Sequence, residues 1–102
     1  MKESLGEKPH FVYEAPLRYG PEIIDVISGR VEIGESTPKA TYQVAGALLN
    51  RQKDGEEGVK VEVNGVRFQN GKPLVSGDPA VQAFLREVRR VNGRGHKSKA
   101  PK

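Results

Sequence analysis

Near the start of the chain, hydrophobic and polar residues alternate with a period of two. The pattern covers residues 10–15 (His-Phe-Val-Tyr-Glu-Ala) and predicts a β-strand. Phe11 and Tyr13 fall on one face of this strand, because successive side chains in a strand point to opposite sides. Pro16 is expected to end the strand, since proline has no backbone N–H to offer a neighbouring strand.

Residues 22–28 (Glu-Ile-Ile-Asp-Val-Ile-Ser) fit two kinds of element. Pro21 before them and Gly29 after them suit a helix of two turns. Their four β-branched residues favour a strand. We favour the strand, which would turn at Gly29-Arg30 into a second strand at residues 31–33 and form a hairpin.

Helical spacing follows Ser36 and Thr37, either of which can cap a helix whose first residue is Pro38. Asp54-Gly55 is expected to end this helix. Its apolar positions spread over most of the surface outside one polar stripe, which predicts a largely buried helix. The polar stripe consists of Lys39, Gln43, Gly46, Asn50 and Lys53. The apolar positions are Ala40, Tyr42, Val44, Ala45, Ala47, Leu48 and Leu49.

Residues 59–63 (Val-Lys-Val-Glu-Val) alternate strictly, which predicts another strand. Asn64-Gly65 is a strong signal for a tight hairpin turn, and residues 66–69 are expected to form the return strand. A second turn at residues 70–73 leads into Leu74-Val75.

The last predicted helix has Asp78 as its cap and Pro79 as its first residue, and it runs to about Asn92-Gly93. Its apolar stripe consists of Val81, Phe84, Leu85, Val88 and Val91. The opposite face carries Gln82, Arg86, Arg89 and Arg90.

Two strand groups, each followed by a helix, predict a single α+β domain over residues 10–93. We expect a small antiparallel sheet, built from two hairpin-like strand groups, with both helices packed on one of its faces. A chain of 102 residues leaves no room for a second independent core. Residues 1–9 are expected to form a mobile leader, and residues 94–102 a flexible basic C-terminal tail.

The positive charge of the chain is concentrated near its C-terminus. Residues 1–85 contain ten basic and twelve acidic residues, although the whole chain has a net charge of +4. Residues 86–102 contain seven basic residues and one acid, Glu87, so this segment alone carries +6. Local positive charge of this kind binds polyanions. The candidate nucleic-acid-binding residues are Arg86, Arg89, Arg90, Arg94, Lys97, Lys99 and Lys102.

No aromatic residue lies among these basic residues, so binding would be directed to the phosphate backbone with little sequence specificity. In the alternative interpretation, the same residues only offset the dipole of the last helix and keep the protein soluble. Lys60 and Arg67 would also reach phosphates if the hairpin acted as a wing. We favour an ordinary hairpin that covers the core.

The sequence offers little for catalysis or metal binding. It has no cysteine, which excludes disulfides, thiolate zinc sites and cysteine nucleophiles. His10 and His96 lie near opposite ends of the chain, and neither has the spacing of a metal site or a catalytic triad. We therefore expect no enzyme activity, no cofactor, and no catalytic or metal-binding residues.

The N-terminus lacks the apolar core of a signal peptide, and no apolar stretch is long enough to span a bilayer. The expectation is a cytoplasmic protein without membrane contact.

Two functions from different classes fit these features. The first is a non-enzymatic accessory protein that binds DNA or RNA phosphates through the basic helix face and tail. The second is a structural subunit or adaptor of a larger assembly, such as a virion, whose terminal arms contact neighbouring subunits and whose tail meets an acidic protein surface. A strand at a sheet edge, such as residues 59–63, would favour the second. The sequence leaves homo-oligomer formation open.

Overall fold

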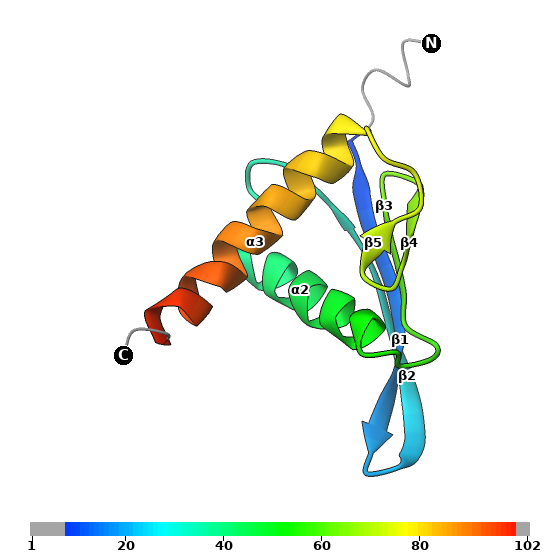
Figure 1. Ribbon diagram of the computed structural model, residues 1–102. Coiled ribbons are helices and arrows are strands. Elements are labelled where there is room, and N and C mark those ends of the chain that lie inside the picture. Colours follow the sequence, from blue (N-terminus) through cyan, green and yellow to red (C-terminus); the bar gives the residue numbers. More distant parts are fainter. Residues whose placement is uncertain (1–7, 100–102) are drawn as a thin grey trace.

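The computed structural model describes residues 8–99, with side chains described for residues 8–93. A five-stranded antiparallel sheet carries two helices on one face (Figure 1), which confirms the predicted α+β fold. The elements in chain order are β1 (His10–Tyr19), β2 (Glu22–Glu32), α2 (Lys39–Lys53), β3 (Lys60–Val63), β4 (Val66–Gln69), β5 (Lys72–Pro73) and α3 (Pro79–Lys99).

The sheet has the strand order β2-β1-β3-β4-β5, so β2 and β5 form its two edges. β1 and β2 form a long hairpin whose turn contains Gly20, with a left-handed φ of 63°. β3 pairs with β1 on one side and with β4 on the other. β3 therefore lies inside the sheet, between β1 and β4, and the prediction that residues 59–63 lie at a sheet edge is wrong.

β2 is one continuous strand, which confirms the strand interpretation of residues 22–28. The predicted turn at Gly29-Arg30 is wrong, because β2 continues through both residues. Gly29 lies opposite Tyr13 in the ladder, and a Cβ at position 29 would lie 2.6 Å from the tyrosine ring. The glycine therefore makes room for an aromatic ring and does not form a turn.

Pro16 does not end β1, contrary to the prediction. The carbonyl of His10 accepts a hydrogen bond from the Asn64 N–H beyond β3, so even-numbered residues of β1 direct their backbone groups towards the β3 side. The missing N–H of Pro16 therefore faces away from β2. The β1–β3 ladder covers only Phe11–Glu14, so proline at position 16 removes no hydrogen bond from either ladder.

α2 ends as predicted at Asp54-Gly55. Gly55 has a φ of 86°, and its N–H donates to the Gln52 carbonyl at 3.0 Å. The Glu56 N–H donates to the Arg51 carbonyl, also at 3.0 Å, which completes a Schellman motif. This turn brings the side chain of Glu56 next to that of Arg51.

The resulting ion pairs hold the β1–β2 hairpin to the end of α2. Arg51 binds the Glu56 carboxylate through Nε at 2.7 Å and Nη2 at 2.5 Å, and the same Nη2 donates to the Pro16 carbonyl at 2.7 Å. Arg18 Nε lies 3.1 Å from the same carboxylate. The hydrogen bond from Arg51 is the main reason that the pKa of Glu56 is lowered to about 2. Beyond this anchor, residues 17–27 form what we call the hairpin arm.

The start of α2 differs from the prediction. Pro38 is the N-cap residue, and neither Ser36 nor Thr37 caps the helix through its side chain. The Thr37 hydroxyl instead accepts a hydrogen bond from the Gly34 N–H at 2.7 Å. α2 is also less buried than predicted, because the sheet and α3 cover a single face of it. The residues left exposed include Ala40, Val44 and Ala47.

The second strand group has the predicted turns. Asn64 and Gly65 join β3 to β4 with φ values of 52° and 80°, and Asn70 and Gly71 join β4 to β5 with values of 57° and 82°. Positive φ at both central residues is the mark of a type I′ turn. The predicted hairpin is therefore confirmed.

Gln52 of α2 is a buried polar residue that ties the helix to this hairpin. Its Nε2 donates to the carbonyls of Val59 at 2.9 Å and Phe68 at 3.2 Å. Its Oε1 accepts a hydrogen bond from the Gly71 N–H at 3.0 Å. Both ends of the amide are satisfied, as the burial of a polar group requires.

The core lies between the sheet and the two helices. The ring of Phe84 in α3 lies 5.3 Å from that of Phe11 in β1 and 5.4 Å from that of Tyr42 in α2. The buried hydrophobic residues are Phe11, Ala15, Tyr42, Ala45, Leu48, Leu49, Val59, Val61, Val63, Phe68, Val81, Phe84 and Val88. Leu85 and Val91 pack against this core half-buried, so the predicted apolar stripe of α3 is confirmed.

α3 begins as predicted, with the Asp78 Oδ1 accepting a hydrogen bond from the Ala80 N–H at 3.2 Å. The helix continues to Lys99 and so passes the predicted end at Asn92-Gly93. A glycine inside a helix costs only about 1 kcal/mol relative to alanine, so it does not by itself end the helix. The predicted mobile leader falls largely on residues 1–7, and the predicted tail on side chains after Gly93 and on residues 100–102. These lie outside the described residues.

Candidate nucleic-acid interface

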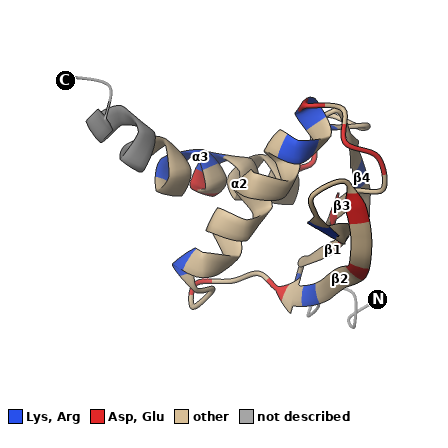
Figure 2. Ribbon diagram, turned by 90° about the horizontal axis from the view of Figure 1, so that it is seen from below, with Lys and Arg blue, Asp and Glu red and all other residues tan. Residues whose placement is uncertain are grey.

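The predicted basic face of α3 is exposed. Arg86, Arg89 and Arg90 are all exposed to solvent, and Figure 2 shows basic positions along the ribbon of α3. The buried residues Val81 and Val88 anchor the same helix, so folding fixes where the three arginines stand. Arg89 lines the groove between α2 and α3, whereas Arg90 lines a separate hollow beside Tyr42 and Phe84, so these two arginines lie at opposite edges of the exposed side of the helix. Arg94, Lys97, Lys99 and Lys102 lie outside the described side chains.

The three arginines differ in their partners. Arg90 forms an exposed ion pair with Glu87 one helical turn before it. The hydrogen bond from Arg90 lowers the pKa of the Glu87 carboxyl below its ordinary value. Arg86 and Arg89 form no ion pair with any other residue between 8 and 93. Of the three arginines, these two therefore have no acidic partner in the described part of the chain.

A groove of about 620 Å³ runs beside this face, between α2 and α3. Lys53 of α2 and Arg89 of α3 both line it, and Leu49 and Val88 contribute apolar surface. Sequence reasoning placed Lys53 only on the polar stripe of α2. Its position near Arg89 depends on how the two helices cross, which residue spacing along one helix does not give.

The crossing of α2 and α3 is close because Gly46 has no side chain. The Asn92 amide lies directly against Gly46, where a Cβ would collide with it. Asn92 Nδ2 donates to the carbonyls of Tyr42 at 3.1 Å and Val88 at 2.9 Å. The hydrogen bond to Tyr42 joins the two helices beside the groove, and the one to Val88 lies within α3.

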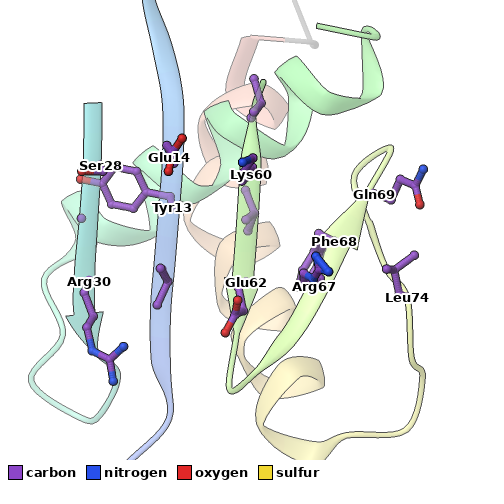
Figure 3. A pocket seen from close by; sticks show the side chains of 14 residues that line it. Tyr13, Glu14, Ser28, Arg30, Lys60, Glu62, Arg67, Phe68, Gln69 and Leu74 are labelled. Atoms are coloured by element: carbon purple, nitrogen blue, oxygen red, sulfur yellow. The ribbon is translucent and has the colours of Figure 1, made fainter. Parts of the chain in front are cut away.

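The opposite face of the sheet carries a second set of charges. It forms a shallow hollow of about 840 Å³ whose charged residues come from four strands (Figure 3). Glu14 pairs in register with Lys60, and Glu62 with Arg67, so opposite charges alternate across the strands. Lys60 and Arg67, the residues proposed for a wing, therefore lie on the sheet face away from the α3 arginines and beside acidic partners.

Within residues 8–99, no helix is long and apolar enough to cross a membrane. Among the described residues, no group of three or more His, Asp or Glu side chains is placed to hold a metal ion. No protein-family model, curated protein or solved structure matches the chain. The function is therefore inferred from the residues and their arrangement alone.

Proposed function

We propose that this protein is a non-enzymatic accessory protein that binds nucleic acid through the α3 face and the groove beside it. The observation that carries the proposal is that Arg86 and Arg89 stand exposed on a rigid helix face without an acidic partner among the described residues. Guanidinium groups bind phosphate oxygens in bidentate pairs, and a fixed helix face holds them ready for binding. Lys53 adds a third cation across the groove.

The chemistry of the surface favours phosphates over bases. The outward face of α3 between residues 79 and 93 carries no aromatic side chain, so bases have nothing to stack on. The sequence adds four more cations in residues 94–102. Such a surface would bind the nucleic-acid backbone with little preference for sequence, because phosphate contacts carry no sequence information.

Fluorescence anisotropy with labelled single- and double-stranded DNA and RNA would test the proposal over a range of salt concentrations. If four to six phosphates are neutralised, log affinity should fall against log salt with a slope of roughly −4 to −5. Arg89→Gln should weaken binding to every sequence and reduce the slope by about 1. The matched control is Arg30→Gln, which removes the same charge from the other face of the sheet.

Removal of residues 94–102 should also weaken binding sharply without unfolding the domain. The proposal is wrong if Arg89→Gln and Arg30→Gln have the same effect, or if the protein binds none of these nucleic acids at low salt.

One observation favours the second candidate, a subunit of a larger assembly. The hairpin arm exposes an unusual amount of apolar surface, with Ile23, Ile24 and Val26 each more than half exposed. Large exposed apolar patches mark interaction surfaces. Light scattering would test this candidate, since a subunit of this kind should form a defined oligomer or filament.

A further inference from the structure

The hairpin arm extends past both helices, so its side chains have no core to pack against (Figure 1). Its apolar residues are at least 36% exposed, and Tyr19 is 76% exposed. The six residues are Leu17, Tyr19, Ile23, Ile24, Val26 and Ile27. They lie on both faces of the arm, because Leu17 and Ile27 share the side of the sheet that carries the helices, whereas Val26 lies on the other side. An isolated arm of this composition is better explained as half of an interface.

β2 also presents an open strand edge. The Pro9 carbonyl accepts a hydrogen bond from the Ile33 N–H, so odd-numbered residues of β1 and β2 direct their backbone groups towards each other. The even-numbered residues 26, 28, 30 and 32 of β2 therefore direct their N–H and C=O groups away from the sheet. Unpaired groups of this kind are the usual template for an added strand.

At both ends of this set of outward-facing backbone groups, at Val26 and Glu32, a group already has a hydrogen-bond partner within the chain. The Val26 N–H donates to the carboxylate of Asp25 at 2.8 Å, and the Glu32 carbonyl lies 3.5 Å from the Thr37 hydroxyl. Between these two points, within the described part of the chain, the outward backbone groups of Ser28 and Arg30 have no hydrogen-bond partner. The open stretch is thus short and centred on Ser28.

We propose that two copies of this chain pair through β2, antiparallel, around a two-fold axis at Ser28. In this register Ser28 lies opposite Ser28 of the second copy, and Val26 lies opposite Arg30. The Val26 N–H would donate its hydrogen bond to the Arg30 carbonyl of the second copy instead of to the Asp25 carboxylate. The interaction is isologous, so the same short strand segment serves both copies.

The register is electrostatically self-complementary. Ile27 would lie opposite Gly29 of the second copy, beside the Tyr13 ring that covers this glycine. Asp25 would lie opposite Val31. No two like charges face each other directly, which such pairing requires.

Antiparallel pairing about an axis perpendicular to the sheet places the helices of both copies on the same side. Ile27 and Leu17 of each copy then lie on one continuous surface with those of the other. The β2 backbone and the side chains beside it form this interface, whereas Leu17 and Tyr19 of β1 lie one strand further from the second copy.

Sedimentation velocity of the full chain without nucleic acid would test the pairing, from micromolar to hundreds of micromolar protein. The wild type should show a concentration-dependent shift from monomer to dimer. Ser28→Pro should remain monomeric, because proline removes an outward N–H that the incoming strand needs and leaves the β1–β2 ladder intact. Ser28→Ala, which keeps the N–H, should dimerise like the wild type.

Residue-resolved amide hydrogen exchange on the wild type supplies a test that needs no variant. The N–H groups of Ser28 and Arg30 should become protected as the protein concentration rises, whereas those of Ile27 and Gly29 should be protected at every concentration. The proposal fails if the wild type stays monomeric, if folded Ser28→Pro still dimerises, or if dimers form without new protection at Ser28 and Arg30. Because no nucleic acid is present, each outcome is independent of the proposed function.

Discussion

Asn92 of α3 occupies the space that a side chain at position 46 of α2 would need. Its amide donates to the Tyr42 carbonyl of α2 and to the Val88 carbonyl of its own helix. The contact makes the helix crossing specific, because glycine at position 46 lets the asparagine reach the Tyr42 carbonyl. It also fixes Arg89, one helical turn before Asn92, relative to Lys53 across the groove.

Gly46→Ala is therefore expected to destabilise the protein, although alanine is the better helix former by about 1 kcal/mol. The new methyl group would displace the Asn92 amide, and overpacking of this kind costs about 1–3 kcal/mol. We expect a net loss of about 1 kcal/mol in the free energy of unfolding, measured by urea denaturation. In an Asn92→Ala background the same change should be neutral or stabilising. Equal effects in both backgrounds would show that the two residues are not coupled.

Gln52→Leu is expected to lower the free energy of unfolding by about 2–4 kcal/mol. Leucine is similar in size to glutamine but cannot form hydrogen bonds. The substitution therefore leaves the Val59 and Phe68 carbonyls and the Gly71 N–H without partners in a buried site. Gln43→Leu is the matched control, because Gln43 is exposed on the same helix. The control should change stability by less than about 0.5 kcal/mol. Similar losses for the two variants would contradict the role given to Gln52.

The Arg51–Glu56 pair predicts a pH dependence of stability. The pKa of Glu56 is about 2 in the folded protein and 4.5 as the reference value, so the carboxylate contributes stability above pH 4.5. That contribution is lost as the pH falls from 4.5 towards 2. Because the pair is partly exposed to solvent, we expect it to be worth about 1 kcal/mol.

Thermal denaturation over this pH range would measure the effect. Glu56→Gln should be less stable than the wild type at neutral pH and should converge with it at low pH. The neighbouring Glu57→Gln is the control and should follow the wild-type curve throughout. A Glu56→Gln curve that runs parallel to the wild type would disprove the assignment.

Glu87→Gln should strengthen nucleic-acid binding. Glu87 holds Arg90 in an ion pair and places the one acidic charge of α3 beside the basic face. Removing that charge frees Arg90 from a solvent-exposed ion pair, which is weak and screened by salt. We expect affinity to rise roughly two- to fivefold at low salt, with less gain at high salt. Unchanged or weaker binding would argue that the nucleic acid does not contact this face of α3.

Much of the fold could be predicted from local sequence signals. The Asn64-Gly65 turn, the Asp78 cap and the apolar stripe of α3 each depend on residues close together in the chain, and all three are present. The errors arose where a partner distant in sequence decides the outcome. Gly29 indicates a turn in the sequence, but in the structure the Tyr13 ring covers it inside β2. Pro16 indicates a strand end in the sequence, but β1 continues because the missing N–H faces away from β2.

In the candidate site, too, features that depend on nearby residues could be predicted, and features that depend on distant residues could not. Helical spacing alone places Arg86, Arg89 and Arg90 on one exposed face. It does not show that Glu87 engages Arg90, because the rotation of both side chains decides that. It also does not bring in Lys53, which reaches the groove through the contact between Gly46 and Asn92. The open edge of β2 depends on strand order, which hydrophobic periodicity does not encode.

Pro16 separates two parts of β1 that differ in how much their length can change. The stretch before it is paired on both sides and supplies Phe11 to the core, so its length is fixed. The stretch after it pairs with β2 alone. Residues could be gained or lost in matched pairs at the tip around Gly20 without altering any contact of the core. The reach of the arm can thus diverge between related proteins while the body of the domain stays the same.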